Sequence, residues 1–169
     1  MFKVQKLIYL FIIINFSLSC KSKEKVSTAA TGTSADTVLL ASIERTPCFG
    51  RCPTYKISIY QSGYVLYDGK QNVKNTGLFY SHLDKNKIGQ IKNYITENNI
   101  YGLDDKYVNP HIADFPSTYT EINLDNKYKR IINTEPEPPK QLSDFEKFLD
   151  SFFNDETVWS RIVRNGEAE

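Results

Sequence analysis

Arg45-Thr46-Pro47-Cys48-Phe49-Gly50-Arg51-Cys52-Pro53 is the stretch around which the rest of the chain is organised. Its two cysteines have three residues between them, and each cysteine lies next to a proline. Proline fixes its own backbone and cannot donate a backbone hydrogen bond, so this stretch does not suit the interior of a helix or strand. The sequence predicts a short, pinned loop here.

Strands are expected on both sides of this loop. Residues 37–44 are largely apolar and form the first strand, and apolar and polar residues alternate from Tyr55 to Tyr60, which is typical of a half-buried strand. Gln61-Ser62-Gly63 is a turn, residues 64–68 form a third strand, and residues 73–80 form a fourth with Gly77 as a bulge. The first half of the domain is therefore predicted to be an antiparallel meander.

A helix, a hairpin and a second helix are expected to follow. Ser81 suits the cap of a first helix, whose buried face carries isoleucines at helical spacing and which ends near Asn98. Residues 100–116 contain two prolines and a glycine and predict an irregular loop. Residues 117–124 and 127–133 form a hairpin, with either a two-residue or a three-residue loop.

The remaining residues complete the predicted fold. An apolar face from Leu142 to Phe152 predicts the last main helix, and Val158, Trp159 and Ile162 predict a short terminal one. We therefore expect an α+β domain over residues 37–163, followed by a tail at 164–169. It would have one antiparallel sheet of about six strands with two main helices packed on one face.

The N-terminus is typical of an exported lipoprotein. Lys3 and Lys6 precede an apolar run that is too short, at about 18 Å as a helix, to cross a bilayer core of about 30 Å. Residues 1–19 therefore predict a signal peptide. The run ends at Cys20 and resembles a lipobox, in which the cysteine is acylated, for example by palmitate; ordinary secretion with an incidental Cys20 is the alternative.

Residues 20–36 are small and polar and predict a flexible linker between lipid and domain. No acidic cluster follows Cys20, and such clusters act as surface-export signals in some bacterial groups. We therefore expect the protein to be anchored in the cell envelope through its N-terminal lipid. The expected site is the outer membrane, with the domain facing the periplasm.

In an oxidising compartment, Cys48 and Cys52 are expected to form a disulfide. A turn brings such a pair to about 5–6 Å between Cα atoms, whereas an extended strand would hold them about 13 Å apart. A redox-active pair, in which Arg51 lowers the pKa of a thiolate, is the alternative. The spacing disfavours it, because thioredoxin-like enzymes use C-x-x-C at a helix N-terminus.

The stretch from Arg45 to Pro53, with Tyr55, Ile59 and Gly63 after it, resembles the opening signature of the bacterial family named domain of unknown function 6438. Asp114-Phe115-Pro116 and the proline-rich segment before the last helix are similar to later blocks of that family. The resemblance would cover about residues 42–160 and implies an envelope protein. It implies no activity and no catalytic residue.

Composition excludes several function classes. The 169 residues carry 21 basic and 20 acidic side chains, so no strong field favours nucleic acid. No catalytic motif is present, and His82 and His111, the only histidines, match no zinc pattern, so neither metal nor cofactor is predicted.

Two functions remain. The first is a non-catalytic module that binds an envelope protein or a cell-wall component, with Arg45, Phe49, Gly50 and Arg51 as its binding loop. The second is a thiol–disulfide oxidoreductase that uses Cys48 and Cys52.

Overall fold

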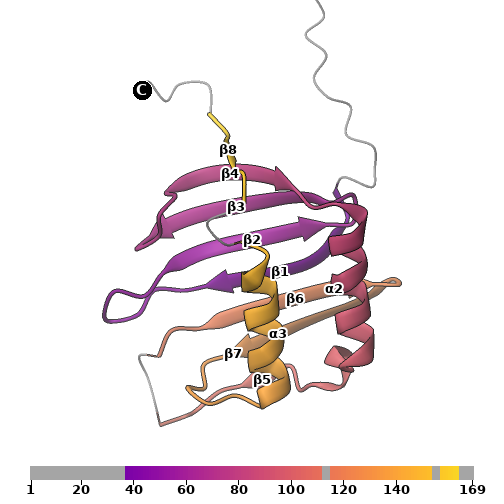
Figure 1. Cartoon of the computed structure of the whole chain (residues 1–169). Helices are drawn as coiled ribbons and strands as arrows, with labels where there is room; N and C mark the ends of the chain where they lie inside the picture. The colour runs from indigo at the N-terminus through magenta and orange to yellow at the C-terminus, as the bar shows by residue number, and fades with distance from the viewer. Residues whose placement is uncertain (1–36, 112–114, 154–156, 164–169) are drawn as a thin grey trace, which may run out of the picture. The chain divides into compact units, whose positions relative to one another are not determined.

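The structure is a computed structural model that describes residues 37–111, 115–153 and 157–163. These residues form two layers, a curved sheet and a pair of helices that cover one of its faces (Figure 1). The elements, in chain order, are β1 (Leu39–Arg45), β2 (Thr54–Tyr60), β3 (Tyr64–Gln71), β4 (Gly77–His82), α2 (Lys85–Glu97), η2 (Ile100–Gly102), β5 (Lys106–Tyr107), β6 (Thr118–Leu124), β7 (Lys127–Asn133), α3 (Lys140–Ser151) and β8 (Ser160–Arg161). The predicted signal peptide, Cys20, the linker and the tail lie outside the described residues.

The sheet corrects the predicted fold class. It has eight strands in the order β5-β7-β6-β1-β2-β3-β4-β8, and β5 runs parallel to β7, so the sheet is mixed. The prediction of a purely antiparallel sheet of about six strands was therefore wrong, although the fold is α+β. The two extra strands have only two residues each, which is too short for an alternating pattern to show in the sequence.

β5 also corrects the prediction of an irregular segment over residues 100–116. The segment starts with the 3₁₀ turn η2 and then pairs Lys106 with Ile132 at the edge of the sheet. At the other edge, Arg161 of β8 pairs with Phe79 of β4, where a short terminal helix had been expected. In both places the strand forms because a strand far away in the sequence offers a free edge. The local alternation of apolar and polar residues cannot predict such pairing.

The turn between β3 and β4 differs from the prediction as well. β4 starts at Gly77 instead of residue 73, because the chain turns at Asn72, whose φ is 55°. A Cβ on Gly69 would clash with the backbone carbonyl oxygen of Asn75, so glycine at this position allows the returning chain to approach closely. This approach places residues 72–75 beside the helix-facing side of β2 and β3, where they line a cavity.

The hairpin between β6 and β7 takes the two-residue alternative. Leu124 pairs with Lys127, and Asp125 and Asn126 both have positive φ, 53° and 60°. Asparagine and aspartate tolerate this left-handed backbone, which suits a two-residue turn. The predicted turn chemistry and one of the two predicted registers are confirmed.

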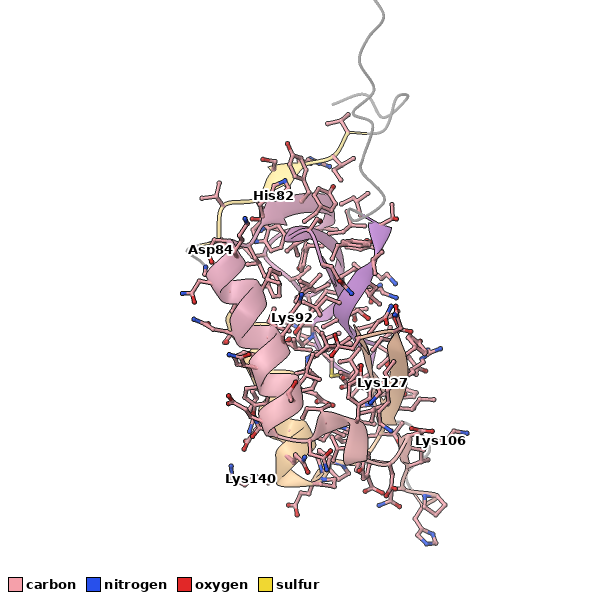
Figure 2. All side chains as sticks on the ribbon, turned by 90° about the vertical axis from the view of Figure 1, so that its right-hand side faces the viewer. His82, Asp84, Lys92, Lys106, Lys127 and Lys140 are labelled. Atoms are coloured by element: carbon pink, nitrogen blue, oxygen red, sulfur yellow. A yellow bond between two sulfur atoms is a disulfide. The ribbon has the colours of Figure 1, made fainter. Side chains whose placement is uncertain are left out.

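The first helix begins later than predicted. Asp84 is its N-cap and accepts a hydrogen bond of 2.8 Å from the backbone N–H of Lys87, whereas Ser81 lies in β4. The helix buries the three isoleucines Ile88, Ile91 and Ile95. In Figure 2, Asp84 lies at the start of this helix and His82 at the end of the strand before it.

The two helices share one core with the sheet. Tyr94 of α2 stacks on Phe145 and Phe148 of α3, with ring centroids 5.6 and 4.2 Å apart. Phe145 and Leu149 are fully buried among the inward-facing residues of the strands. Burial of aromatic and aliphatic side chains of this size supplies most of the driving force for folding.

No helix covers the other face of the sheet in the part of the chain that the structure describes. One end of this face carries a cluster of four rings around Tyr64. The ring centroids of Tyr60, Tyr80 and His82 lie 5.3–5.9 Å from the ring centroid of Tyr64. Across the described ranges, no helix is long and apolar enough to pass through a bilayer.

Candidate functional site

The loop between β1 and β2 contains the disulfide predicted from the sequence. Cys48 and Cys52 are bonded, with their Cα atoms 5.7 Å apart, and the backbone N–H of Gly50 donates to Cys48 Sγ at 3.3 Å. The loop connects two strands, whereas a redox-active pair of the thioredoxin type lies at a helix N-terminus. This setting suits a disulfide that fixes the shape of the loop.

Both ends of the loop are attached to other elements. Thr46 exchanges two hydrogen bonds with Ser117: its backbone N–H donates to the Ser117 carbonyl at 3.0 Å, and its hydroxyl accepts from the Ser117 N–H at 2.7 Å. At the other end, the side-chain amide of Asn72 donates to the carbonyl of Cys52 at 3.0 Å. The loop is therefore fixed by a disulfide within it and by hydrogen bonds on both sides.

The tip of the loop faces solvent. The Phe49 side chain is 92% exposed, and Gly50 and Arg51 are exposed next to it. Phe49 is the most exposed large apolar residue of the described chain. Phenylalanine and arginine are both enriched at the centre of protein interfaces, and arginine is also among the residues that contribute most to binding there.

Arg45 occupies a different place from the tip. Its guanidinium points toward α3 and forms an ion pair of 2.5 Å with Asp150, while its Nε donates to the Tyr55 hydroxyl at 3.1 Å and its Nη1 to Thr118 at 3.2 Å. The Tyr55 hydroxyl donates to the second carboxylate oxygen of Asp150 at 2.7 Å. These contacts connect β1, β2, β6 and α3 at the base of the loop.

Glu146 lies one helical turn before Asp150, and its side chain is only 7% exposed. It accepts a hydrogen bond of 3.2 Å from the Asn133 amide and lies 3.8 Å from Arg45. We call Arg45, Tyr55, Glu146 and Asp150 the base cluster. Two carboxylates and one guanidinium thus meet where the loop joins the sheet.

Burial and charge set the protonation of the base cluster. Burial raises the pKa of Tyr55, and Asp150 raises it further, so the hydroxyl stays protonated and can donate. Burial acts against the charge of Arg45, but Asp150 and its other neighbours outweigh this effect and raise the pKa of the guanidinium. Burial also raises the pKa of Glu146, although Arg45 and Asn133 oppose the change.

A cavity of about 340 Å³ lies beside the base cluster and the disulfide loop. Its walls come from the end of the loop, β2, β3, the turn that follows β3, α3 and the segment after α3. The lining residues are Pro53, Tyr55, Ile57, Tyr67, Asn72, Val73, Lys74, Asn75, Asp150, Phe153, Thr157 and Trp159. A volume of this size falls in the range of small-molecule sites.

Two further cavities lie on the surface of the domain. One of about 310 Å³ has Arg45, Glu146 and Phe115 among its lining residues. Another of about 520 Å³ lies between the end of β4 and the two helices, near His82 and Phe152. Throughout the described ranges, no three metal-binding side chains gather into a cluster.

Sequence reasoning located the loop but missed most of the surrounding site. Asp150 and Glu146 lie on the side of α3 that carries Leu142 and Leu149. Acidic residues beside the buried apolar stripe of a helix could have indicated a buried partner for their charge. The sequence predicted that Trp159 packs against the core, and it does so. Trp159 also lines the cavity, which the sequence did not predict. Cys20, the proposed acylation site, lies outside the described residues.

Comparison with known families now places the chain. Residues 40–153 match the family model described as domain of unknown function, DUF6438. The chain belongs to this family. The matched region of DUF6438 runs from β1 to the residues just after α3, and it includes the disulfide loop and the base cluster. Trp159 follows it. No curated protein matched the chain.

Proposed function

We propose that this DUF6438 protein is a lipid-anchored protein of the bacterial cell envelope whose folded domain is a non-catalytic binding module. Its contact surface is the tip of the disulfide loop, Phe49-Gly50-Arg51. The observation that carries the proposal is the Phe49 side chain, which is 92% exposed on a loop fixed by a disulfide and by hydrogen bonds at both ends.

The position of the loop suits this role. The described chain enters the sheet next to the turn after β2, where the Val38 carbonyl accepts from the Gln61 N–H at 2.9 Å. The loop follows the opposite end of β1, seven residues later, which corresponds to about 20 Å at the usual rise of a strand. A domain tethered through its N-terminus would therefore present the tip away from the point where the tether enters (Figure 1).

The energetics of such a contact also favour the loop. Burying a phenylalanine side chain contributes about 1.5–3 kcal/mol, and an arginine fork can bind a carboxylate through two hydrogen bonds. A constrained loop loses little conformational entropy on binding, so more of this free energy remains as affinity. The expected partner is an envelope protein or a cell-wall component.

The loop is tested by the double substitution Phe49→Ala with Arg51→Ala, expressed in the native envelope. We expect crosslinked partners of the wild-type protein to be lost, while the thermal unfolding midpoint stays within about 2 °C because both side chains are exposed. The matched control is Val108→Ala with Lys106→Ala, another exposed apolar and basic pair, which should keep the partners. An unchanged set of crosslinks in the loop variant would refute the proposal.

The anchor rests on the N-terminal sequence and has its own test. Replacing Cys20 by serine should abolish incorporation of labelled palmitate and release the protein from the membrane fraction, because two or more acyl chains are needed for stable anchoring. Ser22→Ala, two residues away, is the control and should remain labelled. Palmitate incorporation that survives Cys20→Ser would show that the lipid is attached at another residue.

A further inference from the structure

The cavity beside the loop combines apolar rings with polar groups at its rim. Tyr67, Phe153 and Trp159 form one wall, with ring centroids 5.2 Å apart for Tyr67 and Trp159 and 5.6 Å for Phe153 and Trp159. Asn72 and Asn75, from the turn after β3, also line the cavity. Flat apolar surface and amide groups thus border one space that is large enough for a small molecule.

Three polar groups of the lining lack a hydrogen-bond partner among the described residues: the Tyr67 hydroxyl, the Asn75 amide and the indole N–H of Trp159. None of these three groups is among the buried polar atoms of the described residues that lack a partner, so each is open to solvent and to a ligand. Burial raises the pKa of Tyr67, so its hydroxyl stays protonated and can donate. The cavity therefore offers donors and acceptors that a ligand could use.

The charges of the lining disfavour ionic ligands. Asp150 accepts from Arg45 at 2.5 Å and from Tyr55 at 2.7 Å, and the guanidinium balances its charge, which weakens its attraction for a cation. Lys74 is the other charged residue among the described residues of the lining, and it already has an interaction of its own. A neutral ligand with apolar faces and hydrogen-bonding edges matches what remains.

We propose that this cavity binds a neutral saccharide ring. A pyranose has C–H groups on its faces, which can pack on Tyr67 and Trp159, and hydroxyl groups at its rim, which can both donate and accept at Asn75 and at the Tyr67 hydroxyl. Pro53 of the disulfide loop contributes to the same cavity, so a glycan seated there lies next to the exposed loop. The inference rests on the proposed binding function and names its partner class as a cell-wall glycan.

Trp159 makes the test direct, since it is the only tryptophan in the chain. Its fluorescence therefore reports on this cavity alone. The full chain, purified in a polyoxyethylene detergent that has no sugar headgroup, is titrated with two uncharged sugars, cellotetraose and tetra-N-acetylchitotetraose. Inorganic phosphate and choline chloride serve as anionic and cationic probes. We expect a saturable change in Trp159 emission with at least one of the sugars and none with the two ions.

Substitutions then assign the binding to the cavity. Tyr67→Phe removes only the hydroxyl and Asn75→Ala only the amide, and each should weaken sugar binding about fivefold, as expected for one lost hydrogen bond. Asn93→Ala, an exposed asparagine of α2, is the matched control and should bind as the wild type does. Far-UV circular dichroism of every variant confirms that the fold is retained.

The outcomes separate this inference from the proposed function. No change in emission with either sugar up to about 10 mM, a response to phosphate or choline alone, or full sugar binding in the Tyr67→Phe, Asn75→Ala double variant would each overturn the saccharide site. If sugars fail while Phe49→Ala with Arg51→Ala still loses its partners, the loop binds a protein. If the loop variant keeps its partners while sugar binding depends on Tyr67 and Asn75, the saccharide site stands without the loop.

Discussion

Arg45 is the residue that joins the two layers at the base of the disulfide loop. Only 26% of its side chain is exposed, and its three nitrogens reach β2, β6 and α3. Lysine could not replace it, because a single ammonium lacks the planar fork that contacts three elements at once. Since Tyr55 and Asp150 also contact each other, the position of α3 and the start of β2 are coupled through one side chain.

Glu146 leads to a prediction on pH dependence. Because burial raises its pKa, the folded state favours the protonated carboxyl, and ionisation costs stability as the pH rises above the unfolded value of about 4.3. Glu146→Gln cannot ionise but can still accept from Asn133, and Arg45 keeps its ion pair with Asp150. The variant should therefore gain free energy of unfolding relative to the wild type as the pH rises from 4 to 7.

Urea unfolding at pH 4, 5.5 and 7 measures this difference. Asp150→Asn is the control, because it breaks the direct ion pair and should lose stability at pH 7. A Glu146→Gln variant that becomes progressively less stable than the wild type as the pH rises would mean that Arg45 favours the ionised carboxylate more than burial opposes it.

At the scale of elements, long amphipathic patterns were predictable and short strands were not. The stripe of Ile88, Ile91 and Ile95 identified α2 because three turns of a helix repeat the same signal, and only its N-cap was misplaced, since Ser81 and Asp84 are both good caps. β5 and β8 have two residues each and depend on partners far away in the sequence. The base cluster was missed for the same reason, because Arg45 and Asp150 are 105 positions apart.

The disulfide loop is an element whose contribution can be measured. Closing a ring of this size lowers the entropy of the unfolded chain by an amount worth about 2 kcal/mol. Cys48→Ser with Cys52→Ser should lower the free energy of unfolding by about that amount while the fold persists, because the base cluster still holds β1, β2 and α3 together. Chemical denaturation of the two proteins gives the difference.

Reduction of the wild-type protein is the matched comparison, since it breaks the same bond without a substitution. Amide hydrogen exchange should rise most at residues 48–52 in both cases. It should rise less at Leu124, where β6 turns into β7, because this end of β6 is the one farther from the loop. Unfolding of the whole domain on reduction would show that the disulfide supports more than the local shape of the loop.

At the scale of the whole molecule, one core supports two kinds of surface. The region that belongs to DUF6438 contains both helices and most of the sheet, together with Tyr67, Asn75 and Asp150 of the cavity. Trp159 comes from the segment after that region and completes the aromatic wall. The core therefore positions a loop that faces solvent and a cavity that faces the loop, and loss of the core would remove both.

The dependence of the loop and the cavity on the core is expected to be strongest at Phe145. It is fully buried on α3 and stacks on Tyr94 of α2, so its ring joins the two helices above the sheet. Phe145→Ala should cost about 3–5 kcal/mol through lost burial and the cavity left behind, a large part of the 5–15 kcal/mol that stabilises a typical domain. Urea unfolding followed by Trp159 fluorescence measures the loss, and Phe115→Ala, at a site 39% exposed, should cost less than about 1 kcal/mol. A loss at Phe145 as small as that at Phe115 would show that the helices stay on the sheet without this ring, and would place the main support of the loop and cavity in the base cluster.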